Sequence, residues 1–307
     1  MKKYFAGVDA GGTITKIVVA DEIHNIILHK ESPNSVNFYG MSYQQAKDNL
    51  KSLFQDVLNE TGISTFESIC IGMSAFYEEP GQEFQRDFTG FIDTKNILID
   101  SDLRIALECM EDQRGVMVIS GTGSMLAHLQ ETGQVLTVGG FGHIIGDEGS
   151  AYHMAVAAIR AVVRDYEGWG EKTLLTKQLK AFYKISDIHQ LIDIIHNLES
   201  AKSNIADFAV NLDICARQND PVAINILQQE GTYLFLQLVA LINKIGYIPR
   251  TVYYYGSVLM KSDIVRSTFC KKIKERYQDA ITVKPLKSKP EFGALSLSYR
   301  ITEGVSG

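Results

Sequence analysis

Apolar residues along the first hundred positions form short strand-like runs and one longer run with helical spacing. The apolar runs 3–8 and 14–20 flank a glycine turn, which predicts two strands joined as a β-hairpin. Over 42–58 the apolar positions recur every three or four residues, which predicts a helix. Further strands are predicted at 26–29, 68–73 and 96–99, followed by a helix over 105–110.

The same order restarts after Gly115. Residues 116–119 read as a buried strand, Ser120–Ser124 as a second glycine turn and 125–129 as the returning strand. A strand, a glycine–threonine turn and a strand therefore occur twice, which predicts a duplicated α/β domain.

The second half of the chain is predicted to be mostly helical. Ser150 can cap a helix that runs to 163, and Pro221 suits the first turn of a helix that runs to 245. Single helices are expected over 179–197 and 203–217, a strand over 251–255 and a last helix that opens near Phe292. Because the sequence contains no obvious flexible linker, we expect the two halves to pack against each other across a cleft.

Composition and charge narrow the function classes. The chain has 307 residues, of which 45% are hydrophobic and 21% charged, as in an ordinary folded protein of about two domains. Its net charge of −6 argues against nucleic acid or an anionic membrane as the main partner. The longest apolar run, 234–245, is too short to span a membrane, and Asp9 interrupts the first apolar run too early for a signal peptide. We therefore expect a cytoplasmic protein.

The two glycine turns are suited to bind phosphate. Glycine lets backbone N–H groups approach a phosphate chain closely, and a neighbouring hydroxyl adds a hydrogen bond. Gly11-Gly12-Thr13 and Gly121-Thr122-Gly123-Ser124 both fit, although one such turn alone is more often only a tight turn. Neither matches a P-loop or a dinucleotide-binding fingerprint.

Carboxylates accompany these turns. Asp9 directly precedes the first turn, and a carboxylate beside phosphates favours a bound Mg²⁺. Asp102 follows a predicted strand and could act as the base for an acceptor hydroxyl, with Asp100 as a rival two residues away. The segment 139–150 combines five glycines, two carboxylates and His143, a pattern typical of a loop that binds a polyhydroxylated ligand.

Together these motifs resemble the N-acetylglucosamine kinase family, in the BadF/BadG/BcrA/BcrD ATPase group of the actin–Hsp70–sugar kinase superfamily. The resemblance rests on the segments 9–13, 120–124, 140–143 and 146–150 and on Asp102. It implies an α/β fold with two ribonuclease-H-like (actin-like ATPase) domains and ATP with Mg²⁺ in the cleft between them. Residues 1–113, joined by the last helix at about 291–307, would form the first domain and 114–290 the second.

The resemblance also implies roles for individual residues. Asp9 would organise the metal, and Asp102 would take the proton from a sugar hydroxyl, at C6. The sugar would be contacted by Asn34, Ser74, Asp102, Gly140, Phe141, Gly142 and Asp147. The nucleotide would be contacted at its phosphates by Gly11, Gly12, Thr13, Gly121, Thr122 and Gly123, and on its adenosine side by Ala206, Gly256 and Ser257. The family further implies a homodimer.

Other acceptor sugars and other activities remain as alternatives. Relatives often carry Trp where this chain has Phe141, so glucosamine, N-acetylmuramate and other amino sugars stand beside N-acetylglucosamine. The same ATPase group includes activators of 2-hydroxyacyl-CoA dehydratases, which need cysteines for an iron–sulfur cluster. The four cysteines form no C-x-x-C pair, so we expect reduced thiols. A pantothenate kinase and a non-catalytic sugar sensor are the remaining interpretations.

Overall fold

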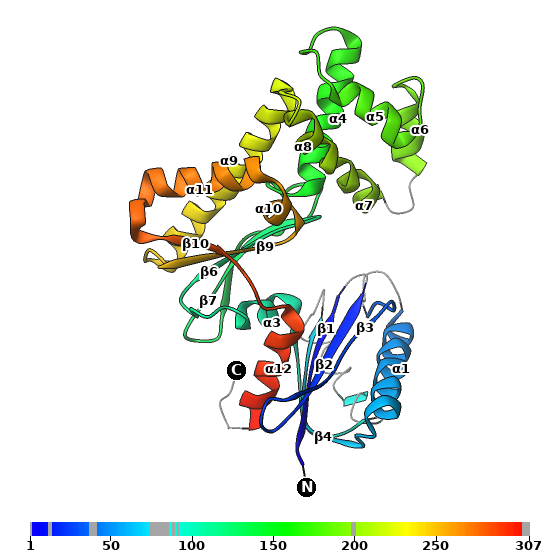
Figure 1. Cartoon of the computed structure of the whole chain (residues 1–307), viewed down its shortest axis with the longest axis vertical. Coiled ribbons are helices and arrows are strands. Elements are labelled where there is room, and N and C mark those ends of the chain that lie inside the picture. The colour runs from blue at the N-terminus through cyan, green and yellow to red at the C-terminus, as the bar shows by residue number, and fades with distance from the viewer. Residues whose placement is uncertain are drawn as a thin grey trace. The chain divides into compact units, whose positions relative to one another are not determined.

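The computed structural model describes residues 2–11, 14–36, 42–73, 86–87, 90, 92–197 and 201–302. The chain folds into two compact units (Figure 1). Unit 1 comprises Met1–Gln113, Glu131–Gly133 and Leu286–Gly307, and unit 2 comprises Arg114–Gln130 and Gln134–Pro285.

Unit 1 contains a five-stranded mixed sheet in the order β3-β2-β1-β4-β5. The strand β1 pairs antiparallel with β2 and parallel with β4, so it lies at the centre of the sheet. The elements of unit 1 are β1 (Tyr4–Ala10), β2 (Thr15–Asp21), β3 (Ile26–Ser32), α1 (Tyr43–Thr61), β4 (Thr65–Met73), β5 (Asp93–Ser101), α3 (Asp102–Glu108) and α12 (Pro290–Thr302).

Helices cover both faces of this sheet, which explains why its central strands β1 and β4 are mostly apolar and buried. On one face Ala6 and Val8 of β1 join the core that α1 supplies through Leu50 and Phe54. On the other face Phe5 packs with Leu295 of α12. Figure 1 shows α1 and α12 on opposite sides of the sheet. Alternate residues of one strand therefore serve two separate cores.

Unit 2 contains a sheet in the order β10-β9-β6-β7-β8. Read from β8, it repeats the topology of unit 1, with three antiparallel strands followed by two parallel ones. The structure thus confirms the duplicated pattern and the α/β fold. Its elements are β6 (Val116–Ser120), β7 (Ser124–Leu129), β8 (Val135–Gly139), α4 (Ala151–Glu167), α5 (Leu175–Tyr183), α6 (Gln190–Asn197), α7 (Ala201–Ala206), η1 (Asp207–Ala209), α8 (Val210–Ala216), α9 (Pro221–Ile245), β9 (Thr251–Tyr255), α10 (Ser257–Lys261), α11 (Asp263–Tyr277), η2 (Gln278–Ala280) and β10 (Thr282–Pro285).

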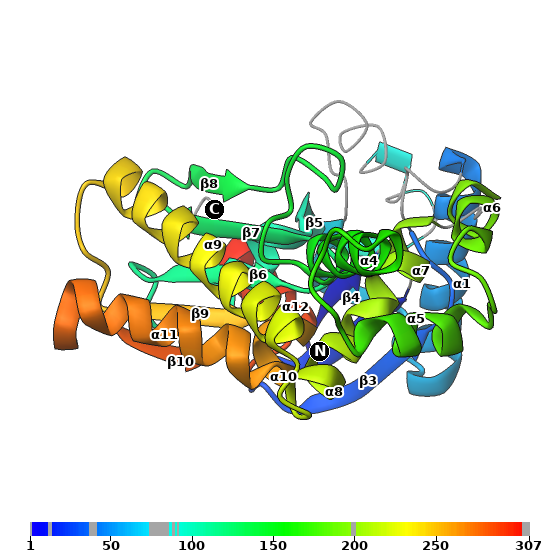
Figure 2. The same ribbon diagram turned by 90° about the horizontal axis from the view of Figure 1, so that it is seen from above.

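Two long helices, α9 and α11, lie side by side over the sheet of unit 2 (Figure 2). Gly231 of α9 allows this close approach, because a Cβ there would lie 2.5 Å from the Val265 carbonyl oxygen of α11. The helix over 221–245 begins and ends as predicted, with the Asp220 side chain accepting from the Ala223 N–H and Gly246 as the left-handed C-cap. In the described residues no helix is both long and apolar enough to cross a membrane.

Two predicted helices of unit 2 are wrong in detail. The expected helix over 179–197 is interrupted, because Lys184 takes a left-handed φ of 55° and ends α5. The Gln190 side chain then accepts N–H groups from Ser186 and Asp187 and starts α6. The expected helix over 203–217 contains the 3₁₀ turn η1 between α7 and α8.

The packing of α12 against α3 predicts a sharp effect of one added methyl group. A Cβ on Gly293 would lie 1.9 Å from the Ile105 carbonyl oxygen, so Gly293→Ala must separate the two helices. We expect a loss of about 2–3 kcal/mol in unfolding free energy, measured by urea denaturation, despite the better helix propensity of alanine. Thr302→Ala, at the exposed end of α12, serves as the control and should change stability by less than about 0.5 kcal/mol. Equal stability of the two variants would contradict this packing.

Candidate functional site

The carboxyl ends of the parallel strands in unit 1 bring acidic residues to one edge of the sheet. Asp9 of β1 aligns with Gly72 of β4, and Gly72 aligns with Asp100 of β5. Asp102 follows as the first residue of α3. Ligands of open α/β sheets bind at such strand ends, so this edge is the candidate site of unit 1.

The helix that presents Asp102 is held firmly. Ser101 caps α3, and its hydroxyl accepts from the Arg104 N–H at 3.0 Å. The buried Glu108 then pairs with Arg104 at 3.0 Å and with Arg300 of α12 at 2.7 Å. The Asp102 side chain itself is exposed, which suits a residue that meets a substrate.

Asp100, the rival of Asp102, has a different environment. Its Oδ1 accepts the Ser101 N–H at 2.6 Å, and burial raises the pKa of the carboxyl. Asp100 is therefore less accessible to a ligand than Asp102, which is exposed.

Asp9 lies in a strongly acidic environment. Its pKa is raised to about 6, chiefly by burial and further by the nearby Glu291 and Asp102 carboxylates, while Lys16 opposes the shift. Glu291 is fully buried; its Oε1 contacts His29 Nε2 at 2.9 Å, whereas its Oε2 has no hydrogen-bond partner in the described part of the chain.

This environment fits a divalent cation beside Asp9. A cation would relieve the repulsion between the carboxylates. No group of three or more His, Cys, Asp or Glu side chains that could hold a metal occurs among the described residues.

The first glycine turn is described only in part. Gly11 lies beside the segment of Asn34, because the Ser35 hydroxyl donates to the Gly11 carbonyl at 3.1 Å. The Thr15 hydroxyl likewise donates to the Asn34 carbonyl at 2.8 Å. Three predicted site residues, Gly12, Thr13 and Ser74, lie outside the described residues.

In unit 2, hydrogen bonds join the second glycine turn to the glycine-rich loop. We call Gly121–Ser124 the phosphate turn and residues 139–150 the glycine loop. The Ser124 hydroxyl donates to the Glu148 carbonyl at 2.7 Å, and the Gly140 N–H donates to the Ser124 carbonyl at 3.1 Å. The Ala151 N–H, directly after the loop, donates to the Gly121 carbonyl at 2.8 Å. The two segments are therefore one bonded structure.

The glycine loop has an unusual backbone. Positive φ values occur at Gly139, Gly140, Gly142 and Gly149 and also at Asp147, where φ is 63°. A non-glycine residue in this conformation marks a position held by its surroundings, as is common at functional sites. Phe141 projects from the same loop with 76% of its surface exposed, so its ring can cover an apolar face of a ligand.

Asp147 is held between the phosphate turn and a helix. It is 3% exposed, and its Oδ2 lies 3.1 Å from Lys202 Nζ on α7. A Cβ on Gly123 would lie 3.0 Å from the same Oδ2, so a larger residue there would press against this carboxylate.

The adenosine-side candidates meet the phosphate turn at the strand ends of β6 and β9. Gly256 has a φ of 101°, and a Cβ there would lie 2.3 Å from the Ser120 carbonyl oxygen. The Ser257 N–H lies beside Gly121. Ala206 is buried at the end of α7, one helical turn after Lys202. Thr122 is exposed at the tip of the phosphate turn.

Two residues that support this site carry no motif in the sequence. The buried Glu230 of α9 accepts the Gly149 N–H at 2.7 Å and lies 2.8 Å from His153 Nδ1. Its carboxylate raises the pKa of His153 above the ordinary value. Lys202 is the other. Both lie far along the chain from the glycine loop, so only the fold reveals them.

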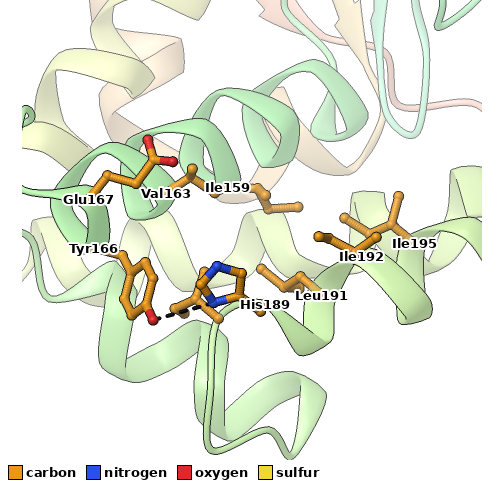
Figure 3. A pocket seen from close by; sticks show the side chains of 9 residues that line it. Ile159, Val163, Tyr166, Glu167, His189, Leu191, Ile192 and Ile195 are labelled. Carbon is orange, nitrogen blue, oxygen red and sulfur yellow. Dashed lines mark hydrogen bonds between the residues drawn. The ribbon is translucent and has the colours of Figure 1, made fainter.

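A separate apolar pocket of about 280 Å³ lies between α4 and α6 (Figure 3). Its polar edge is the pair formed by the Tyr166 hydroxyl and His189 Nδ1, 3.3 Å apart. The lining residues are Ile159, Val163, Tyr166, Glu167, Ile188, His189, Leu191, Ile192 and Ile195. None of them is a predicted phosphate or sugar contact, and the lining suits apolar groups.

The raised pKa of Asp9 predicts that the ionised form of this carboxylate lowers the free energy of unfolding. Because the pKa is about 6 in the folded chain against 3.8 ordinarily, the folded state disfavours the ionised carboxylate. Stability should therefore fall as the pH rises from about 4 to about 6. We expect the free energy of unfolding of Asp9→Asn to exceed that of the wild type by about 1–3 kcal/mol at pH 8, measured in urea with a chelator and no nucleotide.

The same comparison at pH 4.5 provides the internal check. There the wild-type carboxyl is mostly protonated, so the difference should shrink towards zero. Asp56→Asn, at an exposed carboxylate of α1, is the control and should show no pH-dependent difference. A difference for Asp9→Asn that is independent of pH would contradict the account.

Solved structures share this fold. The chain superposes on a candidate N-acetylglucosamine kinase from Chromobacterium violaceum with a TM-score of 0.77, at 20% identity, covering 96% of this chain and 98% of the other. It also superposes on a ROK family glucokinase from Streptomyces griseus with a TM-score of 0.55, at 14% identity, covering 97% and 99% of the two chains. At these identities the likeness establishes the two-domain α/β fold alone.

Sequence relatives extend over nearly the whole chain. An N-acetylmuramic acid/N-acetylglucosamine kinase from Clostridium acetobutylicum is 27% identical over 303 residues, covering 96% of this chain and 98% of the relative. An N-acetyl-D-glucosamine kinase from Dictyostelium discoideum is 25% identical, covering 91% and 92% of the two chains. The model of the BadF/BadG/BcrA/BcrD ATPase family matches residues 6–298. With the strand-end carboxylates and the phosphate turn in place, this match shows that the chain belongs to the BadF/BadG/BcrA/BcrD ATPase family.

Proposed function

We propose that this chain is an ATP-dependent kinase that transfers the γ-phosphoryl group to a hydroxyl, at C6, of an amino sugar. N-acetylglucosamine and N-acetylmuramate are the first candidates, since the relatives from Clostridium acetobutylicum and Dictyostelium discoideum are kinases of these sugars. The observation that carries the proposal is the bonded pair of phosphate turn and glycine loop, which combines anion-binding and sugar-binding backbone in one structure.

Each unit would contribute to the reaction. In unit 1, Asp102 accepts the proton of the acceptor hydroxyl, with Asn34 and Ser74 as further sugar contacts. In unit 2, the sugar contacts are Gly140, Phe141, Gly142 and Asp147. The nucleotide contacts are Gly11, Gly12, Thr13, Gly121, Thr122 and Gly123 at the phosphates, and Ala206, Gly256 and Ser257 on the adenosine side.

We also propose Mg²⁺ as the cofactor, held at Asp9. When bound, it would neutralise phosphate charge in the transfer. The acidic surroundings of Asp9 and the unpartnered Glu291 oxygen support this assignment. Three further proposals rest on the family resemblance. They are two actin-like ATPase domains (1–113 with the last helix, and 114–290), a homodimer and a cytoplasmic location.

The environments of the thiols weigh against the dehydratase-activator alternative. Burial raises the pKa of Cys109 to about 11 and that of Cys215 to about 11. The Cys109 thiol already contacts the Lys289 carbonyl oxygen at 3.2 Å. Ligands of an iron–sulfur cluster must be thiolates, so these positions are poorly suited to it.

An ADP-release assay with Mg·ATP tests the proposal. The acceptor panel contains N-acetylglucosamine, N-acetylmuramate, glucosamine, N-acetylmannosamine, glucose and pantothenate. We expect ADP release that depends on an N-acetylated amino sugar. The proposal fails if ATP hydrolysis is slow and the same with every acceptor, and release with pantothenate alone would assign a different kinase.

Two matched variants test the base. Asp102→Asn should lower kcat by about 10²–10⁴-fold, because the hydroxyl loses its proton acceptor, while ATP affinity stays nearly unchanged. Asp100→Asn removes the neighbouring carboxylate, and its effect should be much smaller. Retained turnover in Asp102→Asn, or a larger loss in Asp100→Asn, would remove Asp102 from this role.

A further inference from the structure

Lys202 places a positive charge beside the phosphate turn. Its Nζ is 3.1 Å from Asp147 Oδ2, and that oxygen is 3.0 Å from the point where a Cβ on Gly123 would lie. The two distances keep the ammonium within about 6 Å of that point, which lies one bond length from the Gly123 Cα. A phosphoryl group bound to the backbone N–H groups of the turn is therefore within reach of this long, flexible side chain.

The charge of Asp147 makes such a cation necessary. A nearly buried carboxylate packed against Gly123 would repel the phosphates of a nucleotide, and the repulsion is strong where water is excluded. Lys202 cancels this charge. The lysine ammonium has three donors, and Asp147 takes one of them, so the others can donate to phosphate oxygens.

The helix α7 places Lys202 between two predicted subsites of unit 2. Lys202 and Ala206 are four residues apart and share a face of α7. Ala206 is a predicted adenosine-side contact, and Asp147 is a predicted sugar contact. A phosphate chain that leads from adenosine to the acceptor would pass between them, next to Lys202.

We propose that Lys202 is a catalytic residue whose ammonium contacts the γ-phosphoryl group during transfer, with Asp147 as the positioning residue that orients it. This inference rests on the proposed kinase function. In the step, the acceptor oxygen bonds to the γ-phosphorus and the bond from that phosphorus to the bridging oxygen breaks. The electron pair leaves with ADP, the hydroxyl proton passes to Asp102, and Lys202 stabilises the charge on the transferred group.

Lys202→Met tests the contact by turnover and by calorimetry. We expect kcat to fall by about 10²–10³-fold and ATP affinity to fall by at least about tenfold. The affinity for AMP, which lacks the β- and γ-phosphates, should stay unchanged. Lys202→Arg should recover part of the loss because it keeps the charge. Lys177→Met, at an exposed lysine of α5, is the matched control and should behave as the wild type.

A double variant separates contact with phosphate from simple neutralisation of Asp147. If Lys202 contacts phosphate, Asp147→Asn combined with Lys202→Met should regain only the part of the ATP affinity that the uncompensated Asp147 charge removes, and should still bind ATP more weakly than the wild type. Recovery of the full wild-type ATP affinity in the double variant would overturn the proposal, because Lys202 would then act only by cancelling the Asp147 charge.

A second comparison measures the loss of activity with two different acceptor sugars. N-acetylmuramate carries a carboxylate that N-acetylglucosamine lacks, so a lysine that reads the sugar would affect only the acidic substrate. Equal losses with both sugars support the phosphate contact, and a loss confined to N-acetylmuramate overturns it. ATP affinity is measured without any sugar, so the contact can hold even if the wild type phosphorylates neither sugar and the proposed function fails.

Discussion

The hydrogen bonds between the phosphate turn and the glycine loop are the constraint on which the site of unit 2 depends. The Ser124 hydroxyl donates to the Glu148 carbonyl, and the Gly140 N–H donates to the Ser124 carbonyl. The buried Glu230 carboxylate accepts the Gly149 N–H. Glycine-rich backbone alone would be costly to order. These bonds order it when the unit folds, so the backbone of both segments has its position before any ligand binds.

The two units differ in how the charge of a buried carboxylate near their glycine turns is balanced. In unit 2, Lys202 balances Asp147 directly. In unit 1, burial and the Glu291 carboxylate raise the pKa of Asp9, and Lys16 offsets only part of this shift. A site of the second kind is left with an unmet demand for positive charge, which a divalent cation would satisfy. The same topology thus carries one carboxylate with a direct counter-charge and one whose surroundings stay acidic.

Much of the fold could be predicted because its signals are local. The strands around the two glycine turns and the helix from Pro221 to Ile245 agree closely with the sequence pattern. The break at Lys184 could not be predicted, since it depends on a left-handed residue and on a Gln190 side chain that starts the next helix. Phosphate-turn and loop residues were visible as motifs. Lys202, Glu230 and Glu291 were not, because each reaches its partner from a distant segment and carries no pattern of its own.

The most direct test of the account is the effect of Ser124→Ala on the KM of both substrates. Removing the hydroxyl breaks one bond between the phosphate turn and the glycine loop and leaves every proposed ligand contact in place. The account predicts that the KM values for ATP and for N-acetylglucosamine both rise, by about fivefold, because the two segments act as one structure. Ser267→Ala, an exposed serine of α11, should change neither. A rise in one KM with the other unchanged would contradict the account.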